Sequence, residues 1–118
     1  MTEKKTQLPI GTVEAILAAD DVPEELVPVP EWNCSVLVRG FTKRAQQRWR
    51  KEAANEKGEI DTARLEMLMF VNGVAEPAFT EEHYEALLDK AAGAVDRVLK
   101  KVLELSGLSA GFPEAKEA

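Results

Sequence analysis

Residues 26–40 have the sequence LVPVPEWNCSVLVRG, and they are the part of the chain that favours extended backbone. Val27 and Val29 alternate with prolines, and a β-prone run follows at 36–38. Proline cannot donate a hydrogen bond to a sheet ladder, so the first segment is predicted to be an edge strand or a proline-rich lead-in. The residues between, 31–35, are short enough to connect a β-hairpin. Because two strands alone are only marginally stable, helices must pack on this hairpin.

Helical patterns surround the hairpin. Thr12 is predicted to cap a short helix in which Val13, Ile16 and Leu17 share one face. The other helical segments are predicted over 42–57, over 61–71, and from Thr80 to the stop at Gly107, the last as one helix or as two separated near Asp89. Asn72-Gly73 is a turn signal, and 74–79 is predicted to be a loop.

These segments predict an α+β fold, a mostly α-helical single domain of four to five helices with one β-hairpin. The domain is expected to span residues 10–108, between flexible tails at 1–9 and 109–118. Apolar spacing places the segment 65–71 in the middle of the domain, since it is apolar nearly all round. The side chains predicted to be buried are Trp49, Leu68, Phe70, Leu99 and Val102.

Composition limits the function classes. The chain has 118 residues and a net charge of -6, which argues against a general nucleic-acid binder. Its single cysteine, Cys34, cannot form an intramolecular disulfide, which is compatible with a reducing cytosol. No signal peptide and no apolar run long enough for a membrane helix is found, so a cytoplasmic location and no membrane partner are expected.

The sequence offers no set of residues suited to catalysis. His83 is the only histidine and is predicted to face solvent, because a metal site needs several converging ligands. Cys34 lacks a nearby activating base and is predicted to be a buried or merely tolerated thiol. The paired acidic residues, such as those at 81–82, are expected to be solvated ends and loops. We therefore expect no enzyme activity, no cofactor and no metal.

A local concentration of positive charge is the most unusual feature. From Arg39 to Lys57 there are seven basic and two acidic residues, a net of +5, which leaves -11 for the rest of the chain. The residues predicted to face away from the Trp49 side of the 42–57 helix are Lys43, Arg44, Gln47, Arg50 and Lys51. This face has three interpretations: a solvated surface that balances acidic segments of the same domain, a docking surface for an acidic partner or neighbouring subunit, or a nucleic-acid contact.

In their order along the chain, these segments resemble the tail assembly chaperones of long-tailed bacteriophages and prophages, including the XkdN-like group. The most distinctive matching features are Pro30-Glu31-Trp32 before the strand and the terminal Leu105-Ser106-Gly107-Leu108. The charged helix from Thr42 and the segment Pro77-Ala78-Phe79-Thr80 also match. The resemblance extends over roughly residues 8–110.

The resemblance implies a function. Such chaperones bind the long, helical tape-measure protein, keep it soluble in the host cytoplasm during tail assembly, and are absent from the mature virion. In many relatives a frameshifted longer form recruits the tail-tube protein, which is therefore a further candidate partner. Since one small domain covers only part of a long client, many copies are expected to coat it and to self-associate. The alternative is a nucleic-acid-associated or regulatory phage protein that uses the basic helix 42–57.

Overall fold

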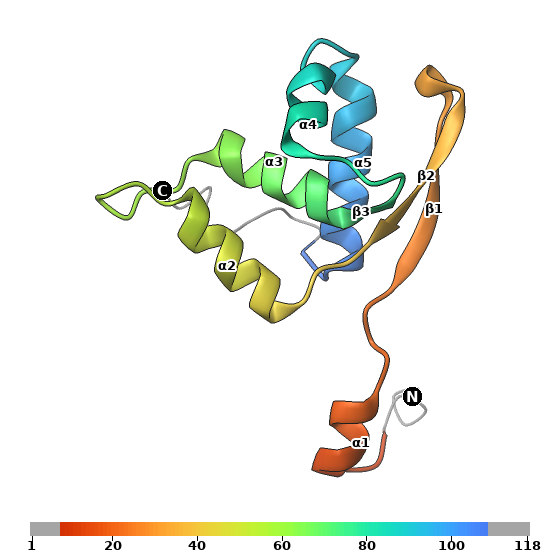
Figure 1. Ribbon diagram of the computed structural model, residues 1–118. Coiled ribbons are helices and arrows are strands. Elements are labelled where there is room, and N and C mark those ends of the chain that lie inside the picture. Colours follow the sequence, from red (N-terminus) through yellow and green to blue (C-terminus); the bar gives the residue numbers. More distant parts are fainter. Residues whose placement is uncertain (1–7, 109–118) are drawn as a thin grey trace, which may run out of the picture.

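The structure, a computed structural model, describes residues 8–108 (Figure 1). Within these residues it contains five α-helices and a three-stranded antiparallel sheet, which confirms the predicted α+β fold dominated by helices. The elements are α1 (Val13–Ala18), β1 (Glu24–Val29), the 3-10 helix η2 (Pro30–Trp32), β2 (Cys34–Arg39), α2 (Lys43–Ala53), α3 (Thr62–Gly73), β3 (Val74–Glu76), α4 (Glu81–Leu87) and α5 (Ala92–Leu105). The predicted C-terminal tail, 109–118, and residues 1–7 of the predicted N-terminal tail, 1–9, lie outside the described residues.

The hairpin forms as the sequence predicts. β1 and β2 pair antiparallel, with Val27 opposite Val36 and Val29 opposite Cys34. The strand order is β1-β2-β3, so β1 lies at the edge of the sheet. Pro28, which has no N–H to donate, therefore lies on an edge strand and not on a central one. Val27 and Val29 are buried, whereas the residues that alternate with them are exposed. The hairpin thus buries one face of the sheet.

The third strand was not predicted. Residues 74–79 were expected to be a loop, but Val74–Glu76 pairs with β2. The Asn72-Gly73 turn signal was also wrong, because α3 continues through Gly73. Gly73 is required for packing instead: a Cβ there would lie 2.7 Å from a methyl carbon of Val102 on α5. The sequence does not distinguish a glycine that is needed for close helix packing from one that is needed for a turn.

The core lies between the helices and the inner face of the sheet. α5 packs on β1 and β2, and α3 contacts α2, α4 and α5, which confirms the predicted central position of this helix. Phe70 on α3 is fully buried, with its ring centroid 5.2 Å from that of Phe79 and 5.3 Å from that of Tyr84. All five side chains predicted to be buried are buried: Trp49, Leu68, Phe70, Leu99 and Val102.

α2 is shorter than predicted. It ends at Ala53 rather than near Lys57, because the Asn55 side chain redirects the backbone. Asn55 Oδ1 accepts hydrogen bonds from the backbone N–H groups of Lys57 at 2.8 Å and Glu59 at 2.9 Å. Gly58 then adopts a positive φ of 83°, which favours glycine. Lys57 therefore lies in a turn and not on the basic helix.

The C-terminal helical region is divided in two, as one of the two alternatives predicted. α4 begins with a capping box, in which Thr80 Oγ1 accepts from His83 N at 3.1 Å and His83 Nδ1 accepts from Thr80 N at 3.0 Å. His83 is exposed, so its visible role is to cap this helix.

One ion pair joins the hairpin turn to α5. Arg97 donates two hydrogen bonds to the Glu31 carboxylate, at 2.7 and 2.8 Å, across 66 residues of sequence. Chiefly because of these hydrogen bonds, the pKa of Glu31 falls from its ordinary value of 4.5 to about 2. A lowered folded-state pKa stabilises the fold above the unfolded value, and this stabilisation is lost as the pH falls from about 4.5 toward 2.

We expect an NMR titration of the Glu31 carboxyl carbon to give a midpoint near 2, and Arg97→Ala to return it toward 4.5. The pair is solvent-exposed, so the accompanying change in stability should be small. An unchanged Glu31 midpoint in the Arg97 variant would show that Arg97 does not hold this carboxylate.

Candidate functional site

The orientation of α2 follows from its inward-facing residues. Trp49 and Ala53 are buried, and Gln46, three residues before Trp49, is 8% exposed. Gln46 Oε1 accepts a hydrogen bond from Lys43 Nζ at 3.0 Å. The helix starts at Thr42, whose Oγ1 accepts from Ala45 N at 3.1 Å. With these residues turned inward, the opposite side of α2 is directed to solvent.

Four of the five predicted binding residues border one shallow groove of about 640 Å³, which we call the basic groove. It is lined by Arg44, Gln47, Arg48, Arg50, Lys51, Ala54, Gly58 and Ile60. Ala54 and Ile60 are partly buried and give the groove an apolar component. The lining contains four basic side chains and no acidic one. Such a groove suits a ligand that combines apolar groups with negative charge.

Lys43 lies elsewhere. It lines a different depression with Phe41, Ser106 and Leu108, and its ammonium group contacts Gln46. Of the five predicted residues, Lys43 is therefore the one that does not line the basic groove. At the first position of α2, Lys43 is turned toward the end of α5, a neighbour that helical spacing does not reveal.

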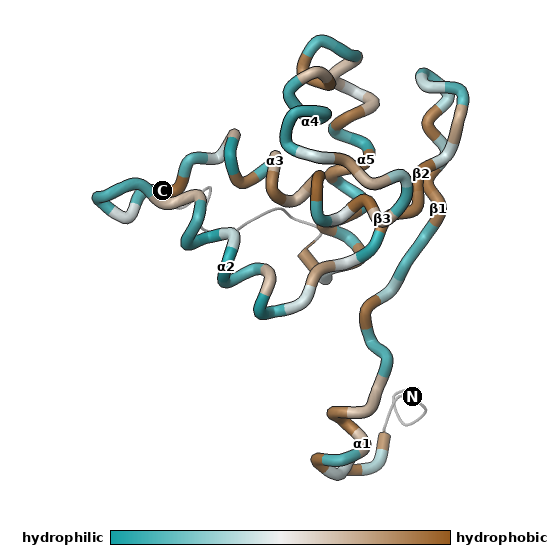
Figure 2. Tube along the Cα trace, viewed as in Figure 1, coloured by the Kyte–Doolittle hydropathy of each residue, from teal (hydrophilic) through white to brown (hydrophobic). Residues whose placement is uncertain are grey.

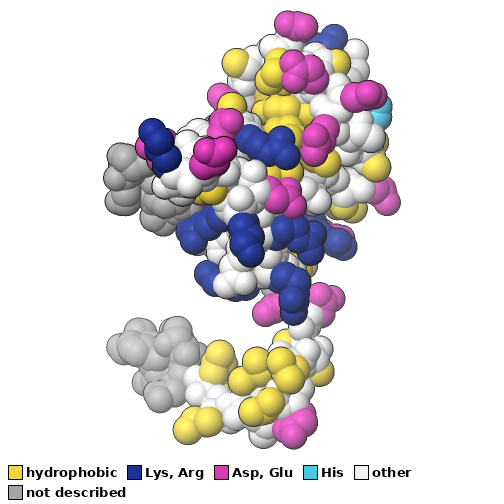
Figure 3. Space-filling model, turned by 60° about the vertical axis from the view of Figure 1, so that its left-hand side comes forward, with side chains coloured by type: hydrophobic (Ala, Val, Ile, Leu, Met, Phe, Trp, Pro, Cys, Tyr) yellow, Lys and Arg dark blue, Asp and Glu magenta, His cyan; other side chains and the backbone are white. Residues whose placement is uncertain are grey.

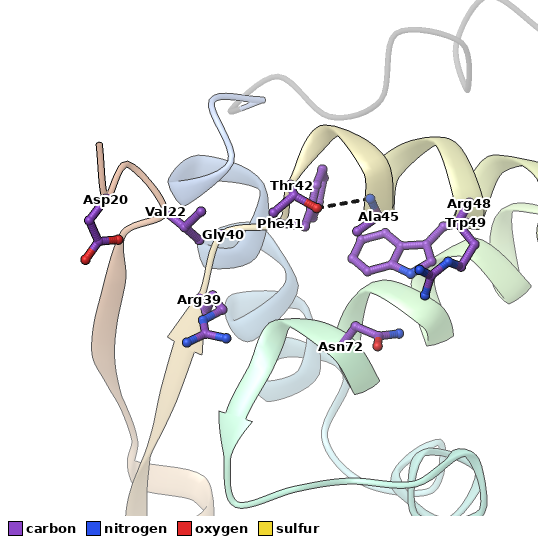
Figure 4. Close-up of a pocket in the computed structure, with 10 residues that line it drawn as sticks. All are labelled: Asp20, Val22, Arg39, Gly40, Phe41, Thr42, Ala45, Arg48, Trp49 and Asn72. Atoms are coloured by element: carbon purple, nitrogen blue, oxygen red, sulfur yellow. Dashed lines mark hydrogen bonds between the residues drawn. The ribbon is translucent and has the colours of Figure 1, made fainter. Parts of the chain in front are cut away.

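Arg48 was missing from the predicted set. It is exposed and lines the basic groove beside Arg44, one helical turn away. Arg48 also lines a second groove of about 420 Å³ (Figure 4). The four-residue spacing from Arg44 was the signal that could have included it.

The second groove lies where the connector before β1 meets the start of α2. Asp20 and Val22 border it on one side, and Phe41 and Trp49 on the other. The Phe41 and Trp49 rings meet edge-to-face with centroids 4.8 Å apart. The groove is therefore bounded partly by the chain that leads out to α1.

α1 extends away from the body of the molecule (Figure 1). Thr12 caps it as predicted, but none of its residues is buried. Figure 2 shows hydrophobic residues along this isolated segment. We call residues 8–18 the apolar arm, and its large exposed side chains are Leu8 (82% exposed), Ile10 (99%), Val13 (68%), Ile16 (65%) and Leu17 (80%). Exposed apolar groups concentrated in one place mark an interaction site.

Charge is also distributed unevenly over these two surfaces. Figure 3 shows dark-blue basic side chains gathered over the body above the arm, and yellow hydrophobic side chains on the arm itself. The arm and its connector, residues 8–21, contain Glu14, Asp20 and Asp21 and no lysine or arginine. The arm is therefore apolar and negative, whereas the basic groove is positive.

The side chains that were considered for catalysis or metal binding do not lie together in the described part of the chain. Across residues 8–108, no group of three or more His, Cys, Asp or Glu side chains is placed to hold a metal ion. Cys34 is exposed at the start of β2. Burial raises the pKa of Glu66 and of Tyr84, with nearby Asp96 contributing to both. Over the same residues, no helix is long and apolar enough to cross a membrane.

Comparison with known proteins bears on the fold. No protein-family model matches the chain, and a search of curated proteins found no match. Among solved structures, the crystal structure of the protein YqbN is similar, with a TM-score of 0.62 and 18% sequence identity. The similarity covers 84% of this chain and 98% of that one. At this identity it supports a shared fold and nothing about function.

Proposed function

We propose that this protein is a phage tail assembly chaperone that binds the tape-measure protein and keeps it soluble until the tail tube forms. The observation that carries the proposal is the exposed apolar arm, in which five large side chains are between 65% and 99% exposed. A domain that leaves so much apolar surface in water is suited to binding another protein. The motif resemblance to tail assembly chaperones supplies the class of partner.

The surface properties agree with a holding role rather than catalysis. A chaperone that coats a long helical client needs apolar contact surface and enough net charge to keep the complex soluble. The net charge of -6 and the separate apolar arm meet both needs. The proposed location is the host cytoplasm, and the protein leaves before the virion is complete. The tail-tube protein is a further proposed partner.

Many copies are needed for one client, because a standard interface covers only about 800 Å² on each partner. Neighbouring copies on the client would be held together by self-association, which raises their effective concentration. Contacts that use the basic groove should weaken as salt rises, since exposed charges are screened. The proposal therefore includes reversible oligomers that dissociate at high salt.

Co-expression tests the client. We expect the tape-measure protein of the same phage to remain in the soluble fraction, and to elute with this chain in gel filtration, only when the folded chain is present. Phe70→Ala, which removes a fully buried ring, is the control for a chain that cannot hold its fold. A tape-measure protein that is equally soluble with and without the chain, with no complex in gel filtration, would contradict the proposal.

The alternative function rests on the four basic side chains that line one groove. Such a surface could contact the phosphate backbone in a nucleic-acid-associated or regulatory phage protein. We favour the chaperone because the net charge of -6 opposes approach to nucleic acid. A tight, salt-sensitive DNA or RNA complex in a mobility-shift assay would favour the alternative. A gene position between those for the major tail protein and the tape-measure protein would favour the chaperone.

A further inference from the structure

The apolar arm and the basic groove have complementary chemistry. The arm presents exposed Ile16 and Leu17 on one short helix, with Glu14 beside them. The groove combines the partly buried Ile60 with a rim of cations that includes Arg44 and Lys51. Apolar groups that meet apolar groups, and carboxylates that meet guanidinium or ammonium groups, are what a specific contact requires.

We propose that the apolar arm of one copy of this chain binds in the basic groove of a second copy. Ile16 and Leu17 lose their exposure to water against the Ile60 side of the groove. The carboxylate of Glu14 approaches the cations of the rim. The groove, whose lining residues include no Asp or Glu, thereby meets a negatively charged side chain.

The structure favours a partner in a second copy over the arm's own body. The connector at Asp20 and Val22 passes the second groove, and α1 then continues away from α2 (Figure 1). In Figure 3 the apolar side chains of α1 stand apart from the basic side chains of the body. A six-residue helix is marginal in water without tertiary contacts. The arm therefore needs a surface that its own chain does not supply in this arrangement.

The contact joins two different surfaces. Each copy can thus give its arm to one neighbour and receive the arm of another, which produces rows or rings rather than a single symmetric pair. One short arm covers less than the ~800 Å² per partner of a standard interface, so the association should be weak and reversible. The inference rests on the self-association in the proposed function and names its contact. An arm bound to a neighbouring copy is not available to the client at the same time, so the two contacts compete for the arm.

Sedimentation velocity of the full chain, from low to high micromolar concentration at about 50 mM and about 500 mM salt, tests the contact. We expect association at low salt that weakens at high salt. The arm variant Ile16→Ser with Leu17→Ser should weaken association at least about tenfold, as should the groove variant Arg44→Glu with Lys51→Glu. Each changed residue is exposed, so circular dichroism should show both variants folded.

Matched controls distinguish this contact from a nonspecific effect of exposed apolar side chains or of net charge. Leu26→Ser with Leu88→Ser removes exposed apolar groups elsewhere, where the side chains are 64% and 58% exposed. Lys90→Glu with Lys100→Glu makes the same change in net charge outside α2. Both control variants should associate like the unmodified chain. Equal losses in the controls would overturn the proposal.

A mixing experiment gives the sharpest test. The arm variant keeps an intact groove, and the groove variant keeps an intact arm. An equimolar mixture should therefore form one-to-one pairs at concentrations at which each variant alone is monomeric. No pairs in the mixture would overturn the inference, since arms that bind each other or their own groove are not rescued by mixing. A chain that is monomeric at all concentrations, yet keeps the tape-measure protein soluble only with an intact arm, would overturn the inference and assign the arm to the client, with the client-binding part of the proposed function left standing.

Discussion

Replacing Phe70 with Ala is expected to lower the free energy of unfolding by about 3–5 kcal/mol. Phe70 has no exposed surface, and its ring lies against Phe79 and Tyr84 with centroids 5.2 and 5.3 Å away. Removing the ring loses its transfer free energy and leaves a cavity in the core beside α3. A domain of ordinary stability has only about 5–15 kcal/mol in total, so much of it would be lost.

Urea denaturation followed by tryptophan fluorescence measures this change, because Trp49 lies in the same core. Leu88→Ala is the control, since Leu88 is a large apolar side chain that remains 58% exposed. Its effect should stay within about 0.5 kcal/mol. A loss below ~1 kcal/mol for Phe70→Ala would show that α3 does not occupy the centre of the domain.

Gly40→Ala is expected to cost about 1–3 kcal/mol through overpacking. A Cβ at this position would lie 2.7 Å from the carbonyl oxygen of Leu105 and 3.0 Å from its carbonyl carbon. Both atoms belong to the backbone at the end of α5, which cannot move aside as a side chain can. Ser106 also holds this junction, because its Oγ accepts from Phe41 N at 2.9 Å and donates to the Val102 carbonyl at 2.7 Å.

Gly93→Ala is the matched control for Gly40→Ala. Gly93 lies within α5, and a Cβ there would meet no atom within 4 Å. Alanine has the higher helix propensity by up to about 1 kcal/mol, so this change should be neutral or stabilising. The difference between the two variants in urea denaturation isolates the close approach of β2 to the end of α5. Equal effects would contradict that geometry.

The elements with strong local patterns were predictable. Val27, Val29 and the run 36–38 alternate or cluster as strand residues do, and the strands lie where this pattern places them. Thr12, Thr42 and Thr80 cap the helices that follow them. Caps and hydrophobic periodicity act within a few residues, so they can be recognised without knowing what packs against them.

The third strand and the end of α2 were harder to predict. Val74–Glu76 is a strand only because β2 lies beside it and shares backbone hydrogen bonds with it. The residues after Ala53 have good helix propensity, yet Asn55 binds the backbone of Lys57 and Glu59 and ends the helix. In both places a specific hydrogen-bond partner outweighed the local preference.

The candidate site shows the same division. Charge counting located the basic helix, and helical spacing placed Arg44, Gln47, Arg50 and Lys51 on its outer side. That these side chains border a groove with Ile60 depends on the turn after α2, which brings Ala54 opposite Ile60. The exposure of the apolar arm was also unexpected from Val13, Ile16 and Leu17, whose spacing equally suits a helix packed on the core.

Sequence alone thus specified the types of element, the inward faces of strands and helices, and the uneven distribution of charge. These properties arise from residue chemistry and short-range spacing. The three-dimensional arrangement was needed for the pairing of β3 with β2, the close contacts at Gly40 and Gly73, the shape of the basic groove and the isolation of the arm. Each of these depends on which distant residues meet, and that is set by the free energy of packing the whole chain rather than by any local pattern.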